Sequence, residues 1–231
     1  MSESVAPASN VPDRAESEPL VVEPVELEIE PAAAAGLFGS QIDRIRAFTH
    51  NLADQGEKLG LIGPLELPRL WSRHILNCAI VAPLLNPGLV GDVGSGAGLP
   101  GLVLAIARPD VNFVLIEPME RRVAWLNDQV TALALPNVTV VRARAEEARM
   151  PHPLDQVTAR AVSAFSKLIP LTAPLLRKGG ELILMKGEGA QREIEAATQP
   201  IRKYRLRDVE IITLGAGVLP EVTRVIRATV D

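Results

Sequence analysis

From residue 88 onward the chain alternates between short apolar runs and amphipathic stretches. The apolar runs predict strands over 89–93, 111–117, 137–143, 157–162 and 181–187. Between them, apolar residues at helical spacing predict helices over about 99–107, 123–133, 164–176 and 190–202. Because the strands are almost continuously apolar, we expect a parallel sheet with helices covering both of its faces.

The pattern changes near residue 204. Residues 204–214 and 222–230 predict two further strands, separated only by a short loop that contains Gly and Pro. Such a loop leaves no room for a crossover helix, so the pair is expected to form an antiparallel hairpin. These elements predict a seven-stranded, Rossmann-like α/β sheet that ends in an antiparallel hairpin, unlike the sheet of a nicotinamide-dependent dehydrogenase.

Ahead of the sheet, apolar stripes at helical spacing within residues 38–86 predict a small helical segment. Residues 1–35 have no periodic apolar face and are rich in Pro, Glu and Ala, a composition typical of disordered chain. We therefore divide the chain into a disordered tail (1–35), N-terminal helices (36–87) and an α/β domain (88–231).

The formal net charge of −4 combines two regions of opposite sign. Residues 1–35 hold eight acidic residues and one basic residue, which leaves 23 basic and 20 acidic residues in the rest of the chain. A mildly basic folded part is compatible with an anionic partner such as nucleic acid. The single cysteine excludes an internal disulfide, no Cys/His group has metal-ligand spacing, and no apolar run is long enough to span a membrane. We expect a cytoplasmic monomer without a metal or a membrane partner.

A glycine-rich loop follows the first predicted strand and matches two ligand-binding patterns. Residues 96–101 fit G-x-G-x-x-G, typical of dinucleotide-binding proteins, and residues 92–98 fit D-x-G-x-G-x-G, typical of enzymes that use S-adenosyl-L-methionine (SAM). Pro100 has no N–H to offer a pyrophosphate, and Glu117, at the end of the second strand, suits the two ribose hydroxyls of a nucleoside. The loop therefore favours SAM, because its glycines would bring the backbone against the methionine portion of the cofactor. The cofactor-binding residues that we predict in the loop are Asp92, Gly94, Ser95, Gly96 and Gly98.

Several motifs together resemble the RsmG (GidB) family. They are R-H-I-L-N at 73–77, G-D-V-G-S-G-A-G-L-P-G at 91–101, R-R-V at 121–123, R-A-E-E at 144–147, S-A-F at 163–165 and K-G at 186–187. Members of this family are bacterial enzymes that transfer a methyl group from SAM to N7 of guanine-527 in 16S ribosomal RNA. The resemblance covers residues 38–231 and implies the class I methyltransferase fold, SAM as cofactor and the small ribosomal subunit as partner.

The resemblance also implies roles for individual residues. Gly94 and Leu99 would line the SAM site, and Ala145 and Glu146 would contact the adenine. Arg160, at the end of the fourth strand, would lie beside the methionine end of the cofactor. Its charge interrupts an otherwise apolar strand, and a charge in such a place needs a partner.

Lys186 ends the fifth strand, at the edge where open α/β sheets bind ligands, and we predict a role for it in the active site or at the RNA. Four other residues are expected to be structural. Trp71 and Trp125 should pack in the core, Cys78 should act as a small buried hydrophobe, and His74 lies on an apolar helix.

Guanine N7 carries an in-plane lone pair and no proton at neutral pH, so its methylation needs no general base. Catalysis would then depend on placing N7, the methyl group and the sulfur in line, an orientation effect of about 7–11 kcal/mol. Two alternatives are a non-catalytic ribosome-assembly factor that keeps the SAM fold to bind RNA, and, less favoured, a nicotinamide-dependent dehydrogenase. The sequence does not exclude the assembly factor.

Overall fold

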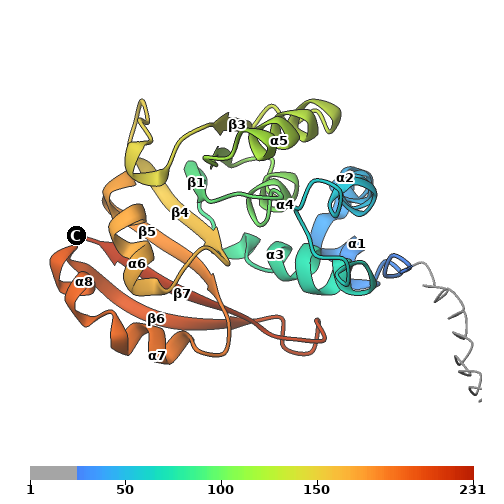
Figure 1. Cartoon of the computed structure of the whole chain (residues 1–231). Coiled ribbons are helices and arrows are strands. Elements are labelled where there is room, and N and C mark those ends of the chain that lie inside the picture. The colour runs from blue at the N-terminus through green and yellow to red at the C-terminus, as the bar shows by residue number, and fades with distance from the viewer. Residues whose placement is uncertain (1–24) are drawn as a thin grey trace, which may run out of the picture.

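The computed structural model describes residues 25–231 and shows a seven-stranded sheet between helices (Figure 1). The strand order is β3-β2-β1-β4-β5-β7-β6. The strands are β1 (Leu89–Val93), β2 (Asn112–Ile116), β3 (Val138–Val141), β4 (Leu154–Arg160), β5 (Leu176–Lys186), β6 (Leu206–Leu214) and β7 (Thr223–Val230). Strands β1 to β5 pair in parallel, and β7 pairs antiparallel with both β5 and β6. The predicted fold class is confirmed.

Helices cover both faces of the sheet, as Figure 1 shows. They are α1 (Ala33–Phe38), α2 (Ile42–Gln55), α3 (Asn77–Ala79), α4 (Gly101–Ala107), α5 (Glu120–Ala132), α6 (Phe165–Thr172), α7 (Ala190–Ala196) and α8 (Thr198–Lys203). A π-helix, Leu70–Leu76, leads directly into α3. Among the residues that the structure describes, no helix is long and apolar enough to cross a membrane.

The sheet separates two hydrophobic clusters. Along β5, Ile183 and Met185 pack into the cluster that also holds the buried residues of α1, α2, α4 and α5, whereas Leu182 and Leu184 pack against α6 and α7. Successive side chains of a strand point to opposite faces, so an apolar run such as residues 182–185 is buried on both sides. This explains why β5 is continuously apolar over these four residues.

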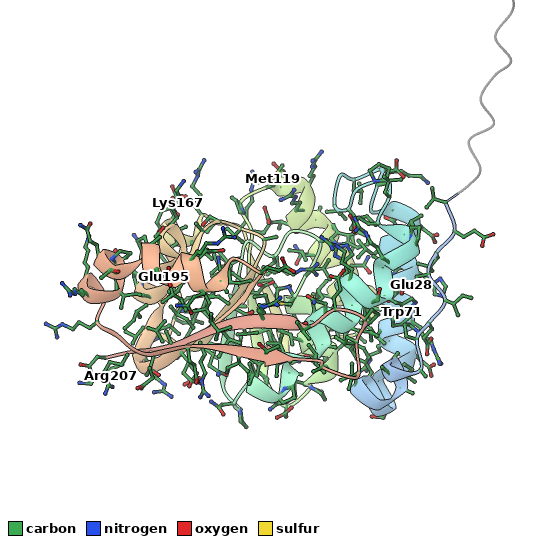
Figure 2. All side chains as sticks on the ribbon, turned by 90° about the horizontal axis from the view of Figure 1, so that it is seen from below. Glu28, Trp71, Met119, Lys167, Glu195 and Arg207 are labelled. Atoms are coloured by element: carbon green, nitrogen blue, oxygen red, sulfur yellow. The ribbon has the colours of Figure 1, made fainter. Side chains whose placement is uncertain are left out.

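Residues 25–35 differ from the disordered tail that composition predicts, whereas residues 1–24 lie outside the described part. The backbone N–H of Glu28 donates to the Leu67 carbonyl at 2.9 Å, and the Glu28 carboxylate accepts the N–H of Ser72 at 2.9 Å. Glu30 pairs with Arg46 at 2.7 Å. Figure 2 shows Glu28 beside Trp71 at one end of the molecule. A high content of acidic residues predicts disorder, but Glu28 and Glu30 accept specific hydrogen bonds that composition alone does not reveal.

Some element boundaries also differ from prediction. Strand β4 ends at Arg160 because Ala161 has a left-handed backbone with φ of 55°, so Val162 is 39% exposed instead of continuing the strand. The helix predicted over 190–202 is divided at Ala197 into α7 and α8. The first of these differences turns the chain toward the ligand-binding edge of the sheet.

Candidate functional site: two cavities at the carboxyl edge of the sheet

The glycine loop leaves β1 at the carboxyl edge of the sheet and turns through left-handed backbone. Gly94, Gly96 and Gly98 have φ of 73°, 53° and 94°. A Cβ atom on Gly94 would lie 2.8 Å from a methyl carbon of Val162, so a side chain at Gly94 would also collide with the chain that follows β4. All three positions favour glycine for backbone geometry, and Gly94 requires it for close approach as well.

Glu117 follows β2 and connects the glycine loop to the start of α5. Its side chain is almost fully buried, and the carboxylate accepts the N–H of Gly96 at 2.9 Å and the N–H of Met119 at 3.0 Å. Each carboxylate oxygen can accept a further hydrogen bond. Glu117 therefore joins the glycine loop to the start of α5 through its carboxylate.

Asp92 lies beneath the loop and is fully buried. One carboxylate oxygen accepts the N–H of Gly101 at 3.0 Å, at the start of α4, and the other has no hydrogen-bond partner among the described residues. Burial raises the pKa of Asp92 to about 7. Ser95 donates to the backbone carbonyl of Asp92 at 2.9 Å. In this structure the Asp92 carboxylate stabilises the start of α4, and its backbone carbonyl stabilises the glycine loop.

A cavity of about 330 Å³ opens above the loop, within the size range of small-molecule sites. Of the predicted cofactor residues, Gly94, Ser95, Gly96, Leu99 and Arg160 line it. Asp92, Gly98, Glu117, Ala145 and Glu146 are not among its lining residues. Ala145 and Glu146 lie in a short 3₁₀ turn after β3, where Ala145 is buried and Glu146 is exposed.

Sequence reasoning missed one wall of this cavity. Residues 61–63, Glu66 and His74 line it from the N-terminal helical segment, and Arg122 lines it from α5. The R-H-I-L-N and R-R-V motifs pointed to His74 and Arg122 without giving them a role. No sequence signal marked residues 61–66, because their contribution depends on how the helical segment folds over the loop.

A second and larger cavity, of about 1060 Å³, opens at the carboxyl ends of β4 and β5. Basic side chains on its walls are Arg73, Arg160, Lys186 and Arg224. Arg160 and Ala161 line both cavities, so the end of β4 forms the boundary between them.

The Arg160 guanidinium is bound entirely by the helical segment. It donates to the carbonyl of Arg73 at 3.1 Å, to the carbonyl of His74 at 3.4 Å and to Nδ1 of His74 at 2.7 Å. It also contacts the sulfur of Cys78 at 3.2 Å. Within residues 25–231 it forms no ion pair with a carboxylate. Among the described residues, the half-buried charge of Arg160 is thus met by neutral acceptors.

Lys186 lies at the edge of the larger cavity with its side chain only 6% exposed. Its ammonium group pairs with Glu193 at 2.9 Å and donates to the carbonyl of Ser163 at 2.7 Å. Glu193 also accepts the N–H of Phe165, at the start of α6, at 2.7 Å. Lys186 therefore connects β5, α6 and α7 around this cavity.

Two of the four residues that we expected to be structural pack in the core, and the other two contact Arg160. Trp71 and Trp125 are buried in the core, and the indole N–H of Trp125 donates to the carbonyl of Ala97 at 3.0 Å. His74 and Cys78, in contrast, contact Arg160. Cys78 is buried as expected, but it belongs to the site as well as to the core.

Solved structures with this fold include SAM-dependent methyltransferases. The chain is similar to M. jannaschii TYW2 in complex with AdoMet, with a TM-score of 0.53 and 22% identity over 69% of this chain and 76% of that chain. It is also similar to the N-methyltransferase NodS of Bradyrhizobium japonicum in complex with S-adenosyl-L-homocysteine, with a TM-score of 0.53 and 12% identity over 80% and 98% of the two chains. The sheet with its terminal hairpin and the glycine loop define the fold of the class I SAM-dependent methyltransferases.

The family can be stated as well. A family model described as rRNA small subunit methyltransferase G matches residues 41–220. The ribosomal RNA small subunit methyltransferase G of Leifsonia xyli subsp. xyli is 74% identical over 204 residues, which cover 88% of this chain and 98% of that protein. Its counterpart in Clavibacter michiganensis is 68% identical over 208 residues, covering 90% and 99%. The chain belongs to the rRNA small subunit methyltransferase G family and is a SAM-dependent rRNA methyltransferase, which confirms the resemblance.

Proposed function

We propose that the protein transfers the methyl group of SAM to N7 of guanine-527 in 16S ribosomal RNA. The observation that carries this proposal is the position of Arg160, which lines both the smaller and the larger cavity. A residue shared by a cofactor cavity and a substrate cavity lies where the two reactants meet. The smaller cavity would hold SAM, and the larger one would admit the RNA base.

The chain's own residues fit SAM in the smaller cavity. Gly94 and Gly96 present bare backbone there, and Glu117 keeps a buried carboxylate against the same loop for the ribose hydroxyls. Ala145 and Glu146 follow β3 and would contact the adenine. SAM supplies an electrophilic methyl group on a sulfonium, and the protein supplies its orientation.

The larger cavity is suited to a nucleic acid because basic residues outnumber acidic ones on its walls, where the acidic residues are Glu188, Glu193 and Glu221. Arg73 and Arg224 on its walls are suited to phosphate oxygens. Lys186 stabilises the wall of the cavity through its ion pair with Glu193, which joins β5 to α7. N7 needs no deprotonation, so the residues at the boundary have only to orient the base and exclude water. Arg160 would do this next to the methionine end of the cofactor.

The test combines methylation with a variant of Arg160. Wild type and Arg160→Ala are incubated with SAM and with unmethylated small subunits or naked 16S rRNA, and N7-methylguanosine is located by reductive cleavage. We expect methylation by wild type, and a loss of about 100-fold or more in Arg160→Ala because small misplacements are costly in an in-line displacement. Arg44→Ala, an exposed arginine on α2, is the control.

A wild type that methylates a different atom or nucleotide would refute the N7 assignment. A wild type that binds small subunits but leaves every guanosine unmodified would support the non-catalytic assembly factor instead. An Arg160→Ala protein with the wild-type rate would leave Arg160 with a structural role only.

A further inference from the structure

Three side chains form a continuous chain of hydrogen bonds into the boundary between the cavities. Nε2 of His74 lies 2.6 Å from the Glu66 carboxylate, and Nδ1 of His74 lies 2.7 Å from a terminal nitrogen of Arg160. We propose that His74, anchored by Glu66, is a positioning residue that fixes the Arg160 guanidinium for methyl transfer. This inference rests on the role proposed above for Arg160.

The donors in this chain can be assigned from chemistry alone. A guanidinium has only N–H donors, so Nδ1 of His74 must be the acceptor and carry no proton. The imidazole proton is then on Nε2 and donates to Glu66. Burial and the neighbouring Arg160 cation lower the pKa of His74, against the opposing effect of Glu66. A neutral imidazole with its proton on Nε2 is the state that the contacts need.

Glu66 is itself held in place. Its carboxylate accepts from Arg69 at 2.6 Å, and Arg73 lies 3.8 Å away. Burial raises the pKa of Glu66, but the hydrogen bonds from His74 and Arg69 outweigh it, and the pKa stays below its usual value. Glu66 therefore remains a carboxylate and fixes the imidazole ring from the side opposite Arg160.

Contact with His74 leaves Arg160 with its positive charge, which a direct ion pair would neutralise. An Arg–carboxylate pair would orient the guanidinium but would also neutralise it. Here the contacts to Arg160 come from an imidazole, two backbone carbonyls and a sulfur, all of them neutral. Arg160 is thus fixed in direction while its charge remains available to anionic groups of cofactor or RNA.

The first test compares two substitutions of His74. His74→Leu removes the acceptor, and kcat, measured at saturating SAM, should fall about 10- to 100-fold. His74→Asn places an amide oxygen near the position of Nδ1, and it should recover most of the lost activity. His50→Asn, an exposed histidine on α2, should match wild type. Equal losses in His74→Leu and His74→Asn, or a loss confined to thermal stability, would overturn the proposal.

The second test asks whether His74 acts through Arg160. In an Arg160→Lys background, which keeps a cation but loses the fork of donors, adding His74→Leu should lower kcat less than about twofold. A histidine that only supports the helix would reduce kcat by the same factor in both backgrounds, and that result would refute a positioning role.

The third test does not depend on methylation, so it separates a failure of this inference from a failure of the proposed function. Nitrogen-15 NMR of the histidine rings, with His74 assigned through His74→Asn, should show the proton on Nε2. Because the pKa of His74 is lowered, its ring should be mostly neutral at pH 6.5, the ordinary pKa of an imidazole. The groups that face His74 are Glu66, Arg73 and Arg160. A proton on Nδ1, or an imidazolium at pH 7, would overturn the proposal even in an active enzyme.

Discussion

Glu117 offers a sharp test of the cofactor site because its carboxylate already serves the fold. Two backbone N–H groups, of Gly96 and Met119, donate to it. Replacing Glu117 by Ala would leave both unpaired in a buried place, so Glu117→Gln is the better perturbation. The amide oxygen of Gln keeps one acceptor, while the charge and one backbone hydrogen bond are lost.

The magnitude follows from the contacts that would be lost. Hydrogen bonds to a charged group contribute about 1.5–3 kcal/mol, so the Kd for SAM should rise about 10- to 150-fold if Glu117 accepts from the ribose hydroxyls. Calorimetry on wild type and Glu117→Gln would measure this directly. Glu120→Gln removes a carboxylate three residues away that pairs with Arg142 on the surface, and its affinity should match wild type.

An analogue of SAM without the 2′ and 3′ hydroxyls makes the test specific. Wild type should bind the analogue about 10- to 150-fold more weakly than SAM, whereas Glu117→Gln should discriminate between the two by less than about threefold. If the variant keeps the full discrimination, Glu117 does not contact the ribose, and its function is confined to joining the two loops.

Three further predictions concern stability. Asp92 has a raised pKa in the folded state, so its protonation stabilises the fold fully below the unfolded pKa of about 4. This contribution, at most ~4 kcal/mol, should be lost as pH rises to about 7. The unfolding free energy from denaturant titrations should therefore fall with pH over this range in wild type, and fall less in Asp92→Asn. Deleting residues 1–24 should leave the Tm unchanged, as their composition predicts, whereas deleting residues 1–31 should lower it by about 3–8 °C in calorimetry, through loss of the contacts to the helical segment. Lys186→Met should cost about 1–3 kcal/mol of unfolding free energy because Glu193, 28% exposed, loses its ion pair and keeps the N–H of Phe165, and a change below about 0.5 kcal/mol would show that Glu193 finds other partners.

Most of the sheet could be predicted because its strands are short apolar runs with clear separators. The hairpin of β6 and β7 followed from loop length alone, and the glycine loop and Glu117 followed from motif and position. The boundary of β4 could not be predicted, because the turn at Ala161 depends on a left-handed alanine that no local pattern demands. Periodicity describes what an element buries, and it does not describe how the chain leaves that element.

The site was predicted from one side only. The residues of the α/β domain that line the smaller cavity were found by motif, whereas Glu66 and residues 61–63 come from a segment whose fold over the loop is a long-range event. His74 was expected to be structural because a histidine on an apolar helix usually is. Its contact with Arg160, 86 positions later, is visible only in the folded structure.

The strand order has a consequence for how the protein is made. Strand β7 is synthesised after the other six, yet it lies between β5 and β6, where Val225 and Ile226 are fully buried. Until β7 leaves the ribosome, β5 has an open edge and β6 has no partner in the sheet. Domains fold as units during synthesis, so this enzyme can close its own sheet only after residues 223–230 have been synthesised and have left the ribosome. A nascent chain that stalls before residue 223 would expose an unpaired edge beside the cavity in which the finished enzyme is proposed to receive ribosomal RNA.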